Sequence, residues 1–404
     1  MRIAFLTPEF VTEANFDGGL ANYLGRVTTS LVQRGHQVEV FVNSTSETQL
    51  EYQGIIVHRL RSGRLLDFMA KANLFLNQRK LPNFFLTISI FKDSLSLNYA
   101  LRKRSKQIHF DIVQAASVSG AGLFANRTPV APVVVRVSSY ARLFTQMYGW
   151  THTMDRKIHD RLEMSAIRNS NWRYAPSQFI AKLFKDDENI DVTVIESPFH
   201  LDNIQFDPGL SEAQADFEPY ALHYGTLGQL KGSGLLAKAL PSILNVLPDF
   251  HLILAGKVEG EVGSDLIELA KAYPGRIRYL GVLPPAQLYP IVHKARIVIL
   301  PSLVDNLPNT CLESMAFGRA MVASENASFE QLIQDGKSGF LAKHGDSTDL
   351  EMTIQKVWCL SEAELAKIGK AAQDRINQMR PEVTVAKLED YYRAVIEDSR
   401  RRIK

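Results

Sequence analysis

The sequence contains little cysteine, no long apolar run and almost no excess of one charge. Its only cysteines, Cys311 and Cys359, both lie in predicted helices and do not form a Cys-x-x-Cys pair. We therefore expect no disulfide scaffold or zinc site and favour a reducing compartment. No apolar run reaches the roughly 18 residues of a membrane span, and the amino terminus lacks the pattern of a signal peptide. A net charge of +3 does not indicate nucleic-acid binding. We expect a cytoplasmic protein, or one peripheral to the inner face of a membrane.

What is present fits a globular chain of ordinary composition. Of the 404 residues, 46% are hydrophobic and 22% are charged. At roughly 100–200 residues per domain, this length suggests two domains. The first 42 residues predict the type of domain: an apolar strand at 2–6, a loop at 7–19, a helix ending at Gly35 and a strand from Val38 to Val42. Strand, loop, helix and strand in this order make a parallel βαβ unit.

The same alternation continues on both sides of a polar segment that contains Pro208 and Gly209. Strands are predicted near 111–114, 132–137, 192–195, 220–224, 250–255, 277–280, 297–300 and 320–323, and helices near 119–127, 154–168 and 232–246. We therefore predict two doubly wound α/β domains, 1–200 and 219–380, that are joined by a linker at 201–218 and face each other across an inter-domain cleft. A last helix within 381–404 would pack on its own domain or cross back to the first one.

Two glycine-containing loops stand between a predicted strand and a predicted helix. Gly18 and Gly19 precede the first helix, and the loop Gly225–Gly232 carries Lys231. Glycine lets backbone N–H groups approach a phosphate, and the start of a helix adds partial positive charge. Neither loop matches the P-loop or the Gly-x-Gly-x-x-Gly pattern. Each could equally be an ordinary tight turn.

The segment 301–313 is the most informative one. It begins at the end of a predicted strand, carries Asp305 in a loop and continues into a helix that carries Glu313. A loop carboxylate can accept sugar hydroxyls, a helix carboxylate can hold a ribose diol, and the N–H groups near Asn309 and Thr310 can hold phosphate. Taken singly, these residues could be turn, cap and solvated helix residues, but their combination favours a site.

Together these segments resemble the retaining, nucleotide-sugar-dependent glycosyltransferases of the GT-B fold, family 4 (glycosyl transferases group 1). The resemblance covers most of the chain. It rests on 18–21, 175–177, 225–232, 254–256, 279–281, 301–302, Glu313–Gly318 and the Asp335-Gly336-x-x-Gly339 pattern. It implies two facing Rossmann-like domains, the first binding the acceptor and the second the nucleotide sugar. It also implies that no metal and no other cofactor is required.

The resemblance assigns roles to individual residues. Glu313 would bind the donor ribose, Lys231 the diphosphate, and Asp305, where the family has glutamate, the sugar hydroxyls near the reacting carbon. The catalytic residues implied are Asp305, Lys231 and Gly19. The donor-binding residues implied are Gly18, Gly19, Thr226, Lys231, Val282, Leu283, Asp305, Asn306, Leu307, Pro308, Asn309, Thr310 and Glu313.

Several positions depart from the family pattern. Thr226 stands where an arginine is common, and Asn306 and Pro308 stand where glycine is usual, so the N–H groups of Asn309 and Thr310 become the expected phosphate donors. Two histidines of the N-terminal domain are replaced, at Gln114 or Ala116 and at Ser138. Gln114 and Ser138 are the acceptor candidates.

The expected partners are a nucleotide-sugar donor, with uridine the first guess for its base and guanosine the second, and a glycan, lipid-linked or small-molecule acceptor. Residues 61–106 hold ten Lys and Arg against two Asp and Glu, interleaved with apolar residues. This pattern predicts either peripheral membrane contact or a helical subdomain with a solvated basic face. The alternatives are a weakly active nucleotide-sugar-binding relative, a nucleotide-sugar 2-epimerase and a dinucleotide oxidoreductase. The sequence does not indicate an oligomeric state.

Overall fold

The computed structural model describes residues 1–13, 19–61, 84–147, 153–201 and 204–403. Gly18 and residues 62–83 of the basic stretch at 61–106 lie outside these described residues. The chain divides into two compact units. Unit 1 comprises Met1–Pro198 and Pro381–Lys404, and unit 2 comprises Phe199–Arg380.

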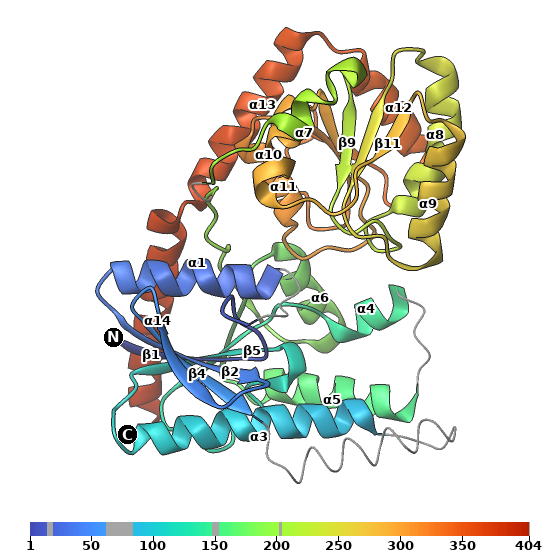
Figure 1. Cartoon of the computed structure of the whole chain (residues 1–404). Coiled ribbons are helices and arrows are strands. Elements are labelled where there is room, and N and C mark those ends of the chain that lie inside the picture. Colours follow the sequence, from blue (N-terminus) through green and yellow to red (C-terminus); the bar gives the residue numbers. More distant parts are fainter. Residues whose placement is uncertain (14–18, 62–83, 148–152, 202–203, 404) are drawn as a thin grey trace. The chain divides into compact units, whose positions relative to one another are not determined.

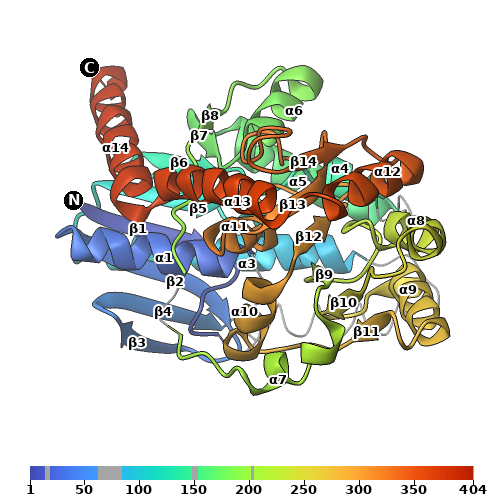
Figure 2. The same ribbon diagram turned by 90° about the horizontal axis from the view of Figure 1, so that it is seen from above.

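Unit 1 is built on an eight-stranded sheet in the order β3-β4-β2-β1-β5-β6-β7-β8. Neighbouring strands are parallel except β3 and β4, which form an antiparallel pair at one edge (Figure 2). The strands are β1 Arg2–Thr7, β2 Gln37–Ser44, β3 Thr48–Tyr52, β4 Ile55–Arg61, β5 Ile112–Ala116, β6 Val133–Arg136, β7 Trp172–Ala175 and β8 Thr193–Val194. The described helices of this unit are α1 Gly19–Gln33, α3 Phe85–Ser105, η1 Val118–Gly120, α4 Ala141–Met147, α5 Met154–Arg168, α6 Gln178–Glu188 and α14 Pro381–Ile403.

Alternating residues of β1 show why this sheet is covered on both faces. Ile3 and Phe5 pack with α1 and α14, whereas Ala4 and Leu6 pack in the cluster that contains α3. All four side chains are buried, as expected for a parallel strand between two helical layers. Figure 1 shows α1 on one side of this sheet and α3 with α5 on the other.

The last helix, α14, belongs to unit 1 and is anchored by polar as well as apolar contacts. The carboxylate of Glu389 accepts hydrogen bonds from Arg34, with Nε to Oε1 at 2.8 Å, and lies 2.7 Å from the Nε2 atom of His36. These contacts lower the pKa of Glu389 to about 2, with Arg34 as the largest cause. Tyr392 is fully buried. The segment 381–404 therefore completes the core of unit 1.

Unit 2 holds a six-stranded, all-parallel sheet in the order β11-β10-β9-β12-β13-β14. Its strands are β9 Ala221–Tyr224, β10 Leu252–Ala255, β11 Ile277–Tyr279, β12 Ile297–Leu300, β13 Ala320–Ser324 and β14 Phe340–Ala342. Its helices are α7 Gly209–Glu212, η2 Ala215–Phe217, α8 Ser233–Val246, α9 Gly260–Ala272, α10 Pro285–Lys294, α11 Asn309–Ala316, α12 Ser347–Trp358, α13 Glu362–Ile376 and η3 Asn377–Met379. Helices α8, α9 and α12 pack on one face, and α10, α11 and α13 on the other (Figure 1).

Two local predictions are wrong, and a third segment contains short helices. Residues 119–127 are not a helix but the end of η1 followed by turns, because Ser119 and Gly120 both adopt left-handed backbone angles that an α-helix cannot contain. The segment 201–218, predicted as a linker, contains α7 and η2. Cys359, predicted within a helix, is the residue that follows α12 and is exposed.

Candidate active site

The candidate site of unit 2 lies where the order of the strands reverses. Going outward from β9, the chain runs to β10 and β11 in one direction, whereas β12, β13 and β14 extend in the other. The loops at the carboxyl ends of β9 and β12 therefore start side by side, and this is where doubly wound sheets bind ligands. These loops are 225–232 and 301–308, the two segments that the sequence singled out.

The two loops are joined by charge. The ammonium group of Lys231 donates to the carboxylate of Asp305 in a short contact, and the second oxygen of Asp305 accepts from the N–H of Asn306 at 2.9 Å. The side chain of Lys231 is 30% exposed and that of Asp305 is 13% exposed. The ammonium group is therefore oriented by its partner, while part of the Lys231 side chain still reaches solvent.

Close backbone packing also fixes the loops. The N–H of Leu303 donates to the carbonyl of Leu230 at 2.8 Å. Gly232 has a left-handed φ of 71°, and a Cβ atom there would lie 1.7 Å from the carbonyl oxygen of Pro301. Only glycine permits this approach. Gly232 is thus required both for the turn in its own loop and for the contact between the two loops.

Two tyrosines that the sequence analysis missed hold Glu313. The hydroxyl of Tyr224 donates to the carbonyl of Thr310 at 2.8 Å and lies 3.2 Å from Oε2 of Glu313. The hydroxyl of Tyr289 lies 3.5 Å from Oε1. Burial, followed by the nearby charge of Glu313, raises the pKa of Tyr224 well above its usual value, so this tyrosine stays a hydrogen-bond donor. No sequence motif marks these tyrosines; the one signal available was that Tyr224 is the last residue of the predicted strand 220–224.

Helix α11 presents free backbone donors. Pro308 is its N-cap, and the carbonyl of Pro308 accepts from the N–H groups of Cys311 at 3.1 Å and Leu312 at 3.2 Å. The N–H groups of Asn309 and Thr310 have no hydrogen-bond partner within the described part of the chain. They carry the positive end of the helix dipole and are suited to an anion.

The remaining predicted donor residues surround these loops. Thr226 is the second residue after β9, and Leu307 packs against the core cluster that contains Leu312 and Met315 of α11. Val282 is 71% exposed, whereas Leu283 packs against the core. Their loop begins at Gly281, whose carbonyl accepts from the N–H of Gly256 at 2.7 Å. The loops after β10 and β11 are therefore in contact.

A buried histidine, His223, lies close enough to Lys231 to feel its charge. His223 in β9 is 1% exposed; its Nδ1 atom lies 2.9 Å from the carbonyl oxygen of Ile299, and its Nε2 atom lies 3.4 Å from the hydroxyl of Ser233. Burial, together with the positive charge of Lys231, lowers the pKa of His223 to about 4. The imidazole is therefore neutral and donates through Nδ1.

In unit 1, Gly19 opens α1, and the first turn of this helix already holds a carboxylate. Oε1 of Glu9 accepts from the N–H of Ala21 at 3.1 Å. Sequence reasoning expected a phosphate near this helix start and did not notice Glu9. The partner glycine, Gly18, lies outside the described residues.

The two acceptor candidates occupy different environments. Gln114 is 2% exposed; its side-chain oxygen accepts from the hydroxyls of Tyr174, at 2.7 Å, and of Tyr392 in α14. Its carbonyl group is thus turned into the core of unit 1. Ser138 lies in the loop after β6 and accepts from Arg136 at 2.6 Å. The structure does not bring these two side chains into hydrogen-bond contact.

The described part of the basic stretch exposes apolar groups. On α3, Phe91, Leu95 and Tyr99 are 37%, 42% and 71% exposed at spacings of four residues. Arg102 and Lys106 continue the same exposed face. Among the described residues, no helix is both long enough and apolar enough to cross a bilayer.

Comparison with solved structures defines the class of fold. Sucrose-phosphate synthase from Thermosynechococcus elongatus aligns over 98% of this chain and 99% of its own, with a TM-score of 0.77 and 16% identity. An Anabaena protein, HepE, crystallised with UDP and glucose, aligns over 98% of this chain and 100% of its own, with a TM-score of 0.67 and 18% identity. The fold is therefore that of the GT-B enzymes, with two Rossmann-like units.

Sequence comparison then gives the family. The model "Glycosyltransferase Family 4" matches residues 17–203, and the model "Glycosyl transferases group 1" matches residues 218–359. A curated relative, D-inositol 3-phosphate glycosyltransferase from Arthrobacter sp. strain FB24, is 24% identical and covers 98% of this chain and 95% of its own. The chain belongs to the family 4 (group 1) glycosyltransferases and is an enzyme of the GT-B type.

Proposed function

We propose that this enzyme transfers a sugar from a nucleoside diphosphate sugar to an acceptor hydroxyl and retains the anomeric configuration. The observation that carries the proposal is the meeting of Lys231, Asp305 and the start of α11 at the strand-order reversal of unit 2. A cation and unpaired helix N–H groups stabilise a diphosphate as it leaves, and carboxylates accept hydroxyls.

The roles of the residues follow from their chemistry. The ammonium group of Lys231 and the N–H groups of Asn309 and Thr310 would hold the diphosphate. Glu313, fixed by Tyr224 and Tyr289, would accept the two ribose hydroxyls. Asp305 would accept hydroxyls of the sugar near the carbon that reacts.

The retaining step needs little proton chemistry from the protein. The bond between the anomeric carbon and the diphosphate breaks, the acceptor oxygen bonds to the same face, and its proton passes to the departing phosphate oxygen. The protein lowers the barrier by stabilising the charge that develops on the diphosphate. We propose that no metal takes part.

The donor is proposed to be a UDP-sugar, which the UDP bound to the HepE relative supports. The curated relative named for D-inositol 3-phosphate supports a small hydroxylated acceptor, with glycans and lipid-linked sugars as further classes. Action in the cytoplasm is part of the same proposal.

A thermal-unfolding panel tests the donor first, using UDP, GDP, ADP and NAD with and without Mg²⁺. A ligand at 100 times its Kd raises the free energy of unfolding by about 2.7 kcal/mol. The melting temperature then rises by a readily measured amount. Stabilisation by UDP independent of Mg²⁺ is expected. Stabilisation by NAD alone, or by none of the four, would contradict the proposal.

Retention is tested separately by NMR of the product formed from a donor of known anomeric configuration. The same anomeric configuration in product and donor is expected. Inversion would overturn the mechanism while leaving the donor assignment intact, and hydrolysis without transfer would indicate a weakly active relative.

A further inference from the structure

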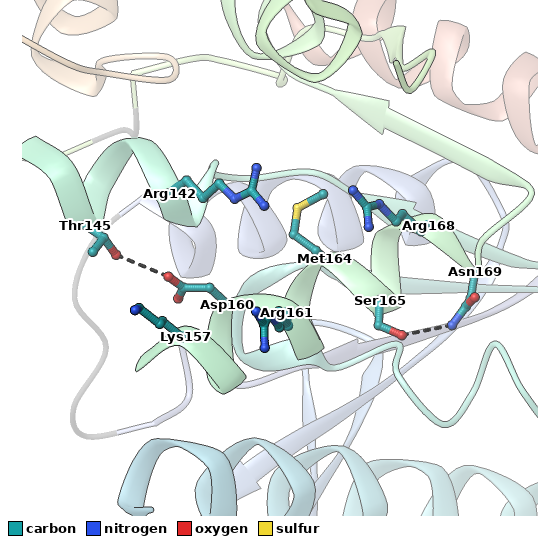
Figure 3. A pocket seen from close by; sticks show the side chains of 9 residues that line it. All are labelled: Arg142, Thr145, Lys157, Asp160, Arg161, Met164, Ser165, Arg168 and Asn169. Atoms are coloured by element: carbon teal, nitrogen blue, oxygen red, sulfur yellow. Dashed lines mark hydrogen bonds between the residues drawn. The ribbon is translucent and has the colours of Figure 1, made fainter. Parts of the chain in front are cut away.

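A cavity in unit 1 collects positive charge away from the residues assigned to transfer. It lies between α4 and α5, has a volume of about 690 Å³, and is shown in Figure 3. Its lining includes four cationic side chains, Arg142, Lys157, Arg161 and Arg168, and one carboxylate, Asp160. None of the residues assigned to donor or acceptor binding lines it. We call it the α4–α5 pocket.

Two of the cations are held by a buried anchor. The carboxylate of Glu188, at the end of α6, is 2% exposed; it accepts from Nη1 of Arg142 at 2.7 Å, from Arg168, and from the hydroxyl of Tyr140 at 2.9 Å. A side-chain hydrogen bond with Tyr140, followed by the charge of Glu188, raises the pKa of Arg142. The side chains of Arg142 and Arg168 are nevertheless 57% and 55% exposed, so their free edges remain accessible.

The other two cations have no such anchor. Lys157 and Arg161 stand one helical turn apart on α5, both are exposed, and neither forms an ion pair with any residue in the described ranges. Asp160 is already engaged, because Thr145 donates to its Oδ2 atom at 3.5 Å and Nδ1 of His159 lies 3.2 Å from its Oδ1 atom. The lining carboxylate, Asp160, and the anchor, Glu188, are thus both occupied, and Asp187 acts on Arg142 through its charge.

Like charges gathered around one hollow repel each other, and a bound anion removes that cost. Guanidinium groups match phosphate oxygens in pairs, and a lysine adds a point charge. The size is typical of a small-molecule site and exceeds what a single oxyanion needs. We propose that the α4–α5 pocket binds a small polyanion carrying two or more phosphate groups, at a site separate from the donor site.

The experiment is isothermal titration calorimetry with inorganic tripolyphosphate at low salt. Because tripolyphosphate could also enter the diphosphate site of unit 2, the titration is done in the Lys231→Ala enzyme. The pocket variant is Lys157→Gln/Arg161→Gln, which leaves the Glu188 anchor intact. The matched control is Arg102→Gln/Lys106→Gln, which removes two exposed cations from the carboxyl-terminal end of α3 in the same unit. Thermal unfolding of each variant checks that it folds.

Binding of tripolyphosphate is expected in the Lys231→Ala enzyme and in the control. The pocket variant should bind at least about tenfold more weakly for each cation removed, since hydrogen bonds to charged groups contribute about 1.5–3 kcal/mol each. Affinity should also fall as salt rises. Absence of binding in the Lys231→Ala enzyme, or equal weakening in the pocket variant and the control, would overturn the proposal. Neither outcome bears on the donor site, which is measured separately with UDP in the wild-type enzyme.

Discussion

Lys231 and Asp305 are 74 positions apart in the sequence, and their side-chain charges meet as an ion pair between the loops after β9 and β12. The pair holds the cation of Lys231 at the loop that leads into α11. An incoming diphosphate would compete with Asp305 for the ammonium group, and Asp305 would then be free to accept sugar hydroxyls. The proposed roles of Lys231 in binding diphosphate and of Asp305 in binding sugar hydroxyls are therefore coupled.

Replacing Lys231 by alanine should lower kcat strongly with the donor at saturation. Loss of one such electrostatic contact typically costs about 10²–10³-fold. Lys238→Ala, which removes an exposed lysine from α8 of the same unit, is the matched control and should leave kcat unchanged. Initial rates of sugar transfer measure the effect. Wild-type kcat in Lys231→Ala would show that the phosphate site is assigned wrongly.

Gly232→Ala should disrupt the same site through the backbone. The added Cβ atom would meet the carbonyl of Pro301 at 1.7 Å at a left-handed φ, so the two loops must separate. A strained left-handed residue alone costs of order 1–3 kcal/mol. Gly275→Ala is the control, because its Cβ atom would have no neighbour within 4 Å. Calorimetric melting should show a lower transition only for Gly232→Ala. Equal transitions would contradict the described packing.

His223 should make stability depend on pH between about 6.5 and 4. Its pKa is lowered to about 4 in the folded protein, so the unfolded chain binds the proton first as pH falls. The contribution of the neutral imidazole to the free energy of unfolding is complete above pH 6.5 and is lost as pH falls toward 4. At about 1.36 kcal/mol per pKa unit, this contribution is about 3 kcal/mol.

Denaturant unfolding of wild type and His223→Leu at several pH values measures this contribution. The variant should lose part of the pH slope in that window. His109→Gln, which changes an 80% exposed imidazole, should keep the wild-type slope. An unchanged slope in His223→Leu would mean that the histidine is not buried as described.

Tyr392→Phe should destabilise unit 1 without a change in shape. The hydroxyl of Tyr392 donates to the buried oxygen of Gln114, and losing a buried hydrogen bond costs about 1 kcal/mol. A fall of a few degrees in melting temperature is expected. Tyr99→Phe, at a 71% exposed tyrosine, is the control and should melt as wild type does. Identical melting of the two variants would argue against the contact.

The exposed face of α3 should bind anionic vesicles if the membrane interpretation of 61–106 is correct. Flotation with phosphatidylglycerol vesicles at low salt measures this, and Phe91→Ser/Tyr99→Ser should float less than wild type, because apolar side chains bury at the interface. Val246→Ser, at a 54% exposed residue of α8, is the control. A failure of the wild-type protein to float would leave a solvated basic face as the interpretation.

The sequence predicted the regular parts of the fold because their signals are local. The helix at 154–168 has the predicted bounds in α5, and the apolar runs at 220–224 and 297–300 became β9 and β12. Parallel pairing then brings the loops at 225 and 301 together without further information. These loops carry Lys231 and Asp305, which the family resemblance assigns to one site.

The supporting residues could not be predicted in the same way. Tyr224, Tyr289 and His223 act through partners 24 to 89 positions away, and nothing near them in sequence marks the contact. Gln114 was an acceptor candidate because it stands where the family has a histidine, yet its side-chain oxygen accepts hydrogen bonds from Tyr174 and Tyr392 in the core. Such side-chain contacts depend on how helices and strands pack against each other, and hydrophobic periodicity does not predict that packing.

The return of α14 to unit 1 also sets an order of events on the ribosome. Residues 199–380 are complete before Pro381–Ile403 has been made, so unit 2 can close its core while unit 1 still lacks its last helix. Until then, Arg34 and His36 lack their contacts with Glu389, and Gln114 lacks its hydrogen bond from Tyr392. The part of the chain synthesised first is therefore the part that finishes folding last.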